Sequence, residues 1–315
     1  MNNRRSFITG LKGTKLSRSE IKFLNKYKPW GVILFTRNLR NIAQIVNLTK
    51  NIKKIFKDKN YPIIIDQEGG RVNRLSKLIS FDTLTSEYFG KLFIKDNRKF
   101  NVIYKLFIDK TSYLLSNLGI NINTVPILDL RYTGTSKVIG DRSFSRNPKI
   151  VSKIGDICIK NFKKNSIGTV IKHIPGHGLS KVDSHYFTPK INKSLNYLKK
   201  NDFKKFKKKN SLFAMTAHII FNKIDPSNTV THSKKMIKII RKQIKFKNIL
   251  ISDDLSMKSL KYNIKLNTIK SFKAGCNLAL HCNGNLKEMN IVAENSPKLN
   301  SFIIKKTSQF YKILS

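Results

Sequence analysis

Short apolar runs alternate with longer amphipathic segments along most of the chain. Eight of these runs have the length and the β-branched content of strands. They span Phe7–Gly10, Gly31–Phe35, Pro62–Asp66, Ile122–Leu130, Thr169–Ile174, Phe213–Ile219, Ile249–Asp254 and Asn277–Cys282. Strands that alternate with helices are typical of βα units around a parallel sheet, and eight such strands close a barrel. The pattern therefore predicts an α/β fold, a single (β/α)8 TIM-type barrel.

The segments between the runs carry helix signals. Ser17 and Glu20 form a capping box that opens a helix ending near Pro29. In the next segment apolar residues recur at helical spacing, and we expect them to pack: Ile42, Ile45, Val46, Ile52, Ile55 and Phe56. Residues 285–315 predict a polar turn and short C-terminal helices. Because no linker or repeat divides the chain, we expect one catalytic domain over residues 1–315.

Chemically useful side chains gather where the predicted strands end. In such barrels the chemistry takes place at the C-terminal ends of the strands and in the loops after them. Lys172, His173 and His218 end two of the strands. Seven of the chain's 18 acidic residues lie at strand ends or in the following loops: Asp66, Glu68, Asp129, Asp141, Asp183, Asp253 and Asp254. We expect these side chains to converge on one rim of the barrel.

The segment from Asp66 to Arg71 reads Asp-Gln-Glu-Gly-Gly-Arg. It places a carboxylate at a strand end, then two glycines that permit a tight turn, then an arginine that can bind an oxygen-rich ligand with both arms of its guanidinium. A buried aspartate that caps a loop would give the same pattern. The segment is therefore a candidate binding element only in combination with other motifs.

A second motif follows the fifth run, where Lys172-His-Ile-Pro-Gly-His-Gly178 is followed by Asp183-Ser-His185. The proline and glycines turn the chain sharply, which leaves Lys172 and His173 at the rim and carries the later residues back over it. Asp183 can orient the His185 imidazole and raise its basicity, as a general acid/base near neutral pH requires. The alternative is a loop held by structural histidine hydrogen bonds.

The seventh run ends abruptly in two carboxylates, Asp253 and Asp254. We expect one to point into the barrel mouth and the other to hold the loop. Retaining glycoside hydrolysis needs a nucleophile and an acid/base group about 5 Å apart. A strand-end carboxylate is common, and this one gains weight as a candidate nucleophile because it shares a rim with a proton donor.

Composition adds a strong positive charge, with 62 Lys and Arg against 18 Asp and Glu and a formal net charge of +44. Such a balance can indicate nucleic-acid binding. The lysines are spread over nearly every predicted helix, however, and no recognition module accompanies them, so we expect solvated basic faces and no specific nucleic-acid partner. The sequence contains no run of about 18 apolar residues, so we predict neither a membrane span nor a signal peptide. Three cysteines without CxxC spacing fit a reducing compartment.

A metal-dependent barrel hydrolase is an alternative from another class. Imidazole and carboxylate ligands could come from His173, His177, Asp183, His185 and His218. The first strand, Phe7–Gly10, lacks the His-x-His pair expected of the common metal barrels, so we predict no metal site.

Seven collinear segments resemble one family. They are GVILFTRNLRN, IIIDQEGGRVNRL, VPILDL, IGDRSFSRNP, KHIPGHG with VDSH, AMTAHI and ISDDLSM. Together they are similar to the single-domain bacterial β-N-acetylglucosaminidases of glycoside hydrolase family 3. The resemblance implies a β-N-acetylhexosaminidase without cofactor that removes terminal N-acetylglucosamine from 1,6-anhydro-N-acetylmuramic acid muropeptides in peptidoglycan recycling. We expect a cytoplasmic monomer with this small carbohydrate as its partner and no membrane contact.

The resemblance also implies residue roles. Asp253 corresponds to the nucleophile, and Asp183 with His185 to the acid/base dyad. The sugar-binding residues of the family correspond to Asp66, Arg71, Arg142, Lys172 and His173. Two related chemistries stay open: a β-glucosidase, and a hexosaminidase in which the substrate's own acetamido group is the nucleophile.

Overall fold

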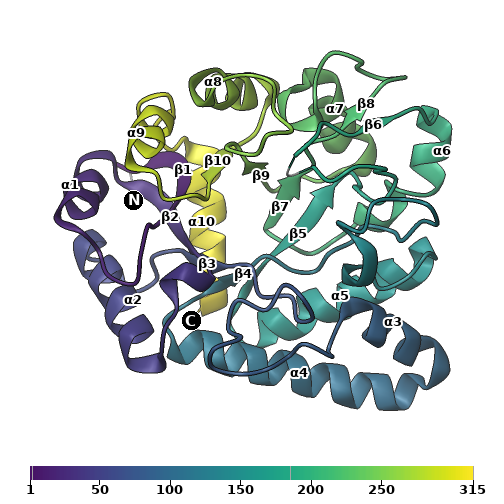
Figure 1. Cartoon of the computed structure of the whole chain (residues 1–315), viewed down its shortest axis with the longest axis horizontal. Helices are drawn as coiled ribbons and strands as arrows, with labels where there is room; N and C mark the ends of the chain where they lie inside the picture. Colours follow the sequence, from purple (N-terminus) through teal and green to yellow (C-terminus); the bar gives the residue numbers. More distant parts are fainter. Residues whose placement is uncertain (2, 185, 315) are drawn as a thin grey trace.

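Eight parallel strands close into a barrel in the order β1-β10-β9-β7-β5-β4-β3-β2 (Figure 1). The computed structural model describes residues 1, 3–184 and 186–314. The barrel strands are β1 Arg5–Gly10, β2 Pro29–Leu34, β3 Ile63–Ile65, β4 Ile122–Asn123, β5 Gly168–Ile174, β7 Phe213–Thr216, β9 Ile249–Asp254 and β10 Leu278–His281. Each predicted run overlaps one of them, which confirms the (β/α)8 TIM-type barrel.

Helices connect the strands on the outside of the barrel. They are α1 Arg18–Tyr27, α2 Ile42–Phe56, α3 Ser86–Lys95, α4 Asn97–Asn117, α5 Pro148–Lys164, α6 Leu195–Lys200, α7 Lys234–Ile239, α8 Ile264–Ala274, α9 Leu286–Glu294 and α10 Ser301–Leu314. Shorter helical turns are η1 Thr36–Asn38, η2 Gly140–Arg142, η3 Lys204–Phe206, η4 Val230–His232 and η5 Ile240–Ile244, and a separate two-stranded sheet joins β6 Lys190–Ile191 to β8 Ile220–Phe221. Within the described ranges, no helix is both long and apolar enough to cross a bilayer.

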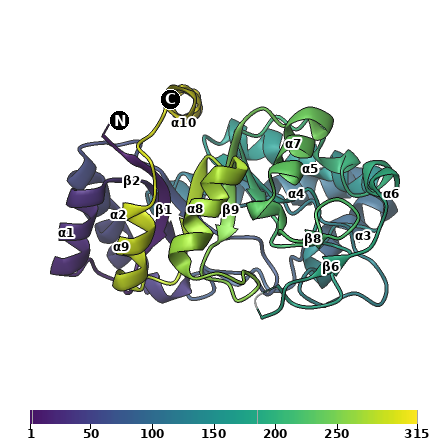
Figure 2. The same cartoon turned by 90° about the horizontal axis from the view of Figure 1, so that it is seen from above.

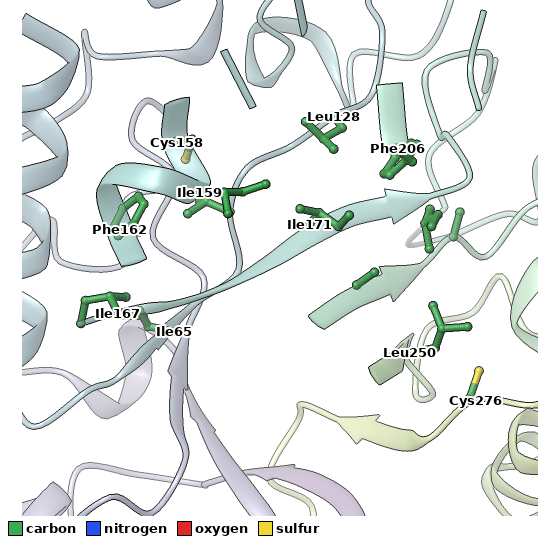
Figure 3. Close-up of a cluster of buried hydrophobic side chains, with 14 of the residues drawn as sticks. Ile65, Leu128, Cys158, Ile159, Phe162, Ile167, Ile171, Phe206, Leu250 and Cys276 are labelled. Atoms are coloured by element: carbon green, nitrogen blue, oxygen red, sulfur yellow. The ribbon is translucent and has the colours of Figure 1, made fainter. Parts of the chain in front are cut away.

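Both faces of the barrel strands are buried, which explains why the strands read as continuous apolar runs. Successive side chains alternate between two clusters. Ile63 and Ile65 belong to the layer between strands and helices, whereas Ile64 points into the barrel interior. Figure 3 shows part of the outer layer, where Ile159 of α5 extends toward the strand that carries Ile171.

The last helix, α10, closes the N-terminal end of the barrel. Phe310 is fully buried and its ring centroid lies 5.5 Å from that of Phe213. The indole nitrogen of Trp30 donates a hydrogen bond of 2.8 Å to Thr307 Oγ1. Figure 2 shows α10 on one side of the barrel and β6 and β8 on the opposite side. The predicted C-terminal helices are therefore present, and α10 leaves the other end free for a site.

The capping box predicted near the start of the chain is present, but one packing prediction for the next helix is wrong. Ser17 Oγ accepts from the Glu20 amide at 3.2 Å and Glu20 Oε2 accepts from the Ser17 amide at 2.9 Å, so the capping box is confirmed. The prediction that Ile42 packs is wrong, because its side chain is 55 % exposed. It is the first residue of α2, directly after the N-cap Asn41.

The fourth strand is much shorter than predicted. The prediction covered Ile122–Leu130, but regular pairing ends at Asn123. Pro126 has no amide hydrogen and cannot donate to a neighbouring strand. Pairing with β5 resumes only as an isolated bridge between Ile127 and Lys172, next to a hydrogen bond of 2.7 Å from the Leu128 amide to the Lys172 carbonyl.

Candidate active site

A cavity of about 260 Å³ lies at the C-terminal ends of the barrel strands. Its volume is just below the range of about 300–1,000 Å³ typical of drug-sized ligands, so it suits a small ligand such as one sugar ring. The predicted site residues that line it are Asp66, Arg142, Lys172, His173 and Asp253. The barrel therefore brings together side chains that lie far apart in the sequence.

Asp253 and Asp254 end β9 and have different environments. Asp254 accepts hydrogen bonds from Ser256 Oγ at 2.9 and 2.8 Å and from the Cys282 amide at 3.1 Å, which fix the loop after the strand. Asp253 Oδ1 accepts from the Asp254 amide at 2.8 Å. Burial alone would raise the pKa of Asp253, but the positive charges of nearby groups, His218 first among them, bring it below the ordinary value. Asp253 is therefore ionised at neutral pH.

Asp66 lies directly after β3 and is surrounded by donors. It accepts hydrogen bonds from Lys172 Nζ, from Thr124 Oγ1 at 2.6 Å and from an Arg74 amino group at 2.9 Å. Burial opposes its ionisation, but the charges of Lys172, Arg74 and Arg142 hold the pKa of Asp66 well below the usual value. This carboxylate can accept hydrogen bonds from ligand hydroxyl groups.

Arg142 reaches the same cavity from the turn Gly140–Arg142. Its guanidinium binds the Glu68 carboxylate with two hydrogen bonds of 2.8 and 2.7 Å, and Lys172 Nζ lies 2.7 Å from the same carboxylate. Burial would lower the pKa of Arg142, but Glu68 more than compensates and raises it. The Glu68 carboxylate thus holds both cations, Arg142 and Lys172, in place at the cavity.

His173 is oriented by the buried Asp129. The His173 Nδ1 atom lies 2.7 Å from Asp129 Oδ2, and the carboxylate also accepts from the His173 and His177 amides. Asp129 has a lowered pKa, because the two histidines outweigh the effect of its burial. An ionised carboxylate only accepts hydrogen bonds, so Nδ1 carries the hydrogen and Nε2 is the other polar atom of this cavity-lining ring.

The loop after β5 contacts the loops after β4 and β9. Gly178 lies so close to the Leu130 backbone that a Cβ atom there would be 2.0 Å from the Leu130 carbonyl oxygen. Ser184 is buried and lines the cavity, and Asp183, beside it, is partly buried. His185 lies outside the described residues. Thr188 Oγ1 donates to the Ser259 carbonyl at 2.5 Å in the loop after β9.

Arg71 is placed differently from the other predicted sugar-binding residues. It is not among the residues that line the cavity. Its guanidinium binds Asp141 at 2.9 Å and donates to the backbone carbonyls of residues 137–139. Nearly half of its side chain is exposed. In this position Arg71 fixes the loop that carries Arg142.

Sequence reasoning missed Arg74, Thr124 and Ser184 as cavity-lining residues. Thr124 lies inside the strand predicted over Ile122–Leu130, so no strand-end signal was available for it. Arg74 belongs to the same segment as Arg71, which follows a predicted strand end, and that position was the available signal. That signal does not say which of two arginines after a glycine turn faces inward.

Residues 1, 3–184 and 186–314 contain no group of three or more His, Cys, Asp or Glu side chains arranged to hold a metal ion. His185, one of the ligands considered for a metal barrel, lies outside this set. Both ring nitrogens of His218, another of the ligands considered, have partners within the protein. Its Nδ1 lies 2.8 Å from Thr231 Oγ1, and its Nε2 lies 2.9 Å from the Asp254 carbonyl.

Residues 6–306 match the family model of the glycosyl hydrolase family 3 N-terminal domain. The chain belongs to glycosyl hydrolase family 3. Within the family it is 34 % identical to a β-hexosaminidase of Neisseria meningitidis serogroup C over 263 residues, 80 % of this chain and 71 % of the relative. It is 33 % identical to a β-hexosaminidase of Haemophilus ducreyi over 287 residues, 88 % of this chain and 80 % of the relative.

A solved structure of this family agrees with the fold. NagZ from Neisseria gonorrhoeae in complex with N-trifluoroacetyl-D-glucosamine superposes with a TM-score of 0.83 at 26 % identity, over 99 % of both chains. The expected resemblance is confirmed, and the family 3 enzyme is a glycoside hydrolase of the β-hexosaminidase type.

Proposed function

We propose that this family 3 enzyme is a retaining exo-β-N-acetylglucosaminidase. Its substrates would be muropeptides in which N-acetylglucosamine is linked to 1,6-anhydro-N-acetylmuramic acid, and its role would be peptidoglycan recycling. The observation that carries the proposal is the shared cavity of Asp253, Asp66, Arg142, Lys172 and His173. The relatives named above support the hexosaminidase class, and the N-trifluoroacetyl-D-glucosamine bound by the gonococcal enzyme supports the sugar.

The binding residues would hold one sugar ring. The Asp66 carboxylate accepts hydrogen bonds from ring hydroxyls, while Arg142 and Lys172 donate charge-assisted hydrogen bonds. His173 offers its Nε2 atom, since Nδ1 is bonded to Asp129. Arg71, which the resemblance placed in this set, would act by holding the 137–141 loop.

The reaction would have two steps with opposite stereochemical changes. First, the Asp253 carboxylate attacks the anomeric carbon and forms an α-glycosyl ester, and the departing oxygen takes a proton from His185. Next, His185 accepts a proton from water as that water attacks the ester, which releases Asp253 and the β-sugar. Asp183 would keep the imidazole oriented through both steps.

A fluorinated N-acetylglucosaminide tests the nucleophile. It should inactivate the enzyme and leave its label on Asp253, because fluorine slows the hydrolysis of the ester. The control is Asp254→Asn, which should still be labelled if it folds. A label on Asp254, or an oxazoline product without any label, would overturn the assignment and favour acetamido participation.

The proton donor is tested by leaving-group dependence. His185→Ala should lower kcat/KM by about 10²-fold or more on N,N′-diacetylchitobiose, whose leaving group needs a proton. On 2,4-dinitrophenyl β-N-acetylglucosaminide, kcat/KM should change little, because that leaving group departs unprotonated. Azide should raise kcat on the activated substrate and give a β-glycosyl azide. Equal losses on both substrates without azide rescue would place the donor elsewhere.

Sugar preference and metal dependence are decided together by a panel of 4-nitrophenyl β-glycosides assayed with and without chelator. The N-acetylglucosaminide should be the preferred substrate, with undiminished turnover after chelation. Preference for the β-glucoside would favour the β-glucosidase alternative. Loss of activity on chelation, restored by a divalent metal, would favour the metal hydrolase.

We further propose that the enzyme works as a cytoplasmic monomer without cofactor, with no nucleic-acid or membrane partner. Sedimentation velocity at several protein concentrations tests the monomer. Association into a dimer would make the sedimentation coefficient rise as the protein concentration increases.

A further inference from the structure

His177 connects the rigid floor of the cavity to the loop that carries Asp183 and Ser184. Its side chain is 2 % exposed and lines the cavity. Its amide donates to Asp129 Oδ1 at 2.7 Å, and Gly178, the next residue, touches the Leu130 backbone. His177 therefore projects from a fixed point in the backbone.

The ring of His177 makes one polar contact with the loop. Its Nε2 atom lies 2.8 Å from Ser184 Oγ, while Nδ1 is buried and has no hydrogen-bond partner among the residues that the structure describes. Burial, and then the neighbouring His173, lower the pKa of His177 to about 4. The imidazole is therefore neutral near neutral pH, and the bond to Ser184 joins two neutral groups in the buried interior.

Ser184 is the point at which this loop enters the cavity. It is 4 % exposed and stands directly between Asp183 and His185 in the sequence. The amides of Tyr186 and Phe187 donate to the Asp183 carbonyl at 3.1 and 2.9 Å, so the chain turns around Ser184. A hydrogen bond at this position restricts where the neighbouring Asp183 can lie.

We infer that His177 is a positioning residue, which holds Ser184 through Nε2 and thereby sets the approach of the proton donor to the leaving oxygen. The inference rests on the proposed function, because the donor is taken from the segment Asp183 to His185. It differs from a role as sugar ligand, in which His177 would contact the ring and assist every substrate equally. The two roles predict different dependence on the leaving group.

The test uses two substitutions that retain different atoms of the imidazole. The amide of His177→Gln extends about as far as Nε2 and can still reach Ser184, whereas that of His177→Asn extends only about as far as Nδ1. On N,N′-diacetylchitobiose, His177→Asn should lower kcat/KM about 10²-fold, a typical contribution of a positioned proton donor. On 2,4-dinitrophenyl β-N-acetylglucosaminide, the same variant should change kcat/KM by less than about threefold. His177→Gln should recover most of the loss.

Ser184→Ala provides the second half of the pair. It should reproduce the selective loss on the disaccharide, and Ser184→Ala combined with His177→Asn should lose little more than either variant alone, because both remove the same bond. Thermal unfolding of each variant shows whether it is folded, and Ser184→Ala, which removes a single oxygen, keeps the test available if His177→Asn does not fold.

Two outcomes would overturn the inference. Equal losses on both substrates would make His177 a sugar ligand, and a His177→Gln variant no better than His177→Asn would show that the bond to Ser184 is not responsible. Failure of the proposed function is distinguishable, because His185→Ala would then lack the leaving-group dependence. In that case a selective loss in His177→Asn would still support positioning of a donor, and its absence would still refute it.

Discussion

At the residue scale, Arg71 and Arg142 show how position decides the role of one residue type. Both guanidinium groups bind a carboxylate, but the Arg142 pair with Glu68 is buried at the cavity and the Arg71 pair with Asp141 is exposed to solvent over nearly half of the arginine side chain. A buried charge-assisted pair keeps its partners in a defined geometry, whereas an exposed ion pair contributes about 0–1 kcal/mol. The two arginines should therefore respond differently to the same substitution.

The comparison of Arg142→Ala with Arg71→Ala tests this difference. Arg142→Ala should lower kcat/KM by about 10²-fold or more, if it removes a hydrogen bond that strengthens in the transition state. Arg71→Ala should lower it by less than about fivefold, through a looser 137–141 loop. Steady-state kinetics on 4-nitrophenyl β-N-acetylglucosaminide measure both. Near-normal kinetics for Arg142→Ala would remove Arg142 from the site, and equal losses would return Arg71 to it.

At the scale of elements, the two ends of the barrel have separate tasks. The ends of β3, β4, β5 and β9 and the loops after them carry most of the polar cavity residues, while α10 packs against the opposite end. Phe310 of α10 is fully buried against Phe213, and its ring also lies beside Gly168 at the start of β5. This separation makes stability and activity independently testable.

Phe310→Ala should lower the free energy of unfolding by about 3–5 kcal/mol, because it leaves a cavity in the sealed end of the barrel. At temperatures where the variant is folded, kcat/KM should stay close to that of the parent enzyme. Val102→Ala is the control, since Val102 on α4 is 60 % exposed and its truncation should change stability by about 0.5 kcal/mol or less. Urea unfolding and kinetics check both variants. A loss of activity without a loss of stability would contradict the separation.

At the scale of the whole molecule, the chain has a net charge of +44, whereas the positive and negative charges that line the cavity nearly cancel. Asp66, Asp253 and Asp254 on its wall are matched by Arg74, Arg142 and Lys172. A field from the surface should therefore act on the approach of a charged substrate and leave the neutral sugar ring unaffected.

Salt should consequently slow the enzyme on anionic substrates only. For a muropeptide disaccharide with a free lactyl carboxylate, kcat/KM should fall about tenfold between low and physiological salt, as the screening length shrinks from about 30 to about 8 Å. The methyl ester of the same disaccharide is the neutral control and should show little change. Equal salt responses of acid and ester would show that the charge does not steer this substrate.

The sequence by itself determined the architecture and most of the site. Apolar runs buried on both faces identified the eight strands, and the rule that barrel chemistry lies at strand ends selected Asp66, Lys172, His173 and Asp253, which share one cavity. These features are local: each depends on a run of neighbouring residues and on its last position.

Only the tertiary structure decided which side chains face inward. Gly69 and Gly70 adopt φ values of 95° and 56°, and the contact of Arg71 with Asp141, 70 positions away, leaves Arg74 as the arginine that reaches Asp66. Likewise β4 stops at Asn123 before Pro126, and His177 meets Ser184 through a loop folded over the cavity. Such contacts depend on the path of distant segments, because the orientation of a side chain is set by the partners that the fold brings within reach. The periodicity of the sequence contains no information about which distant residue that partner is.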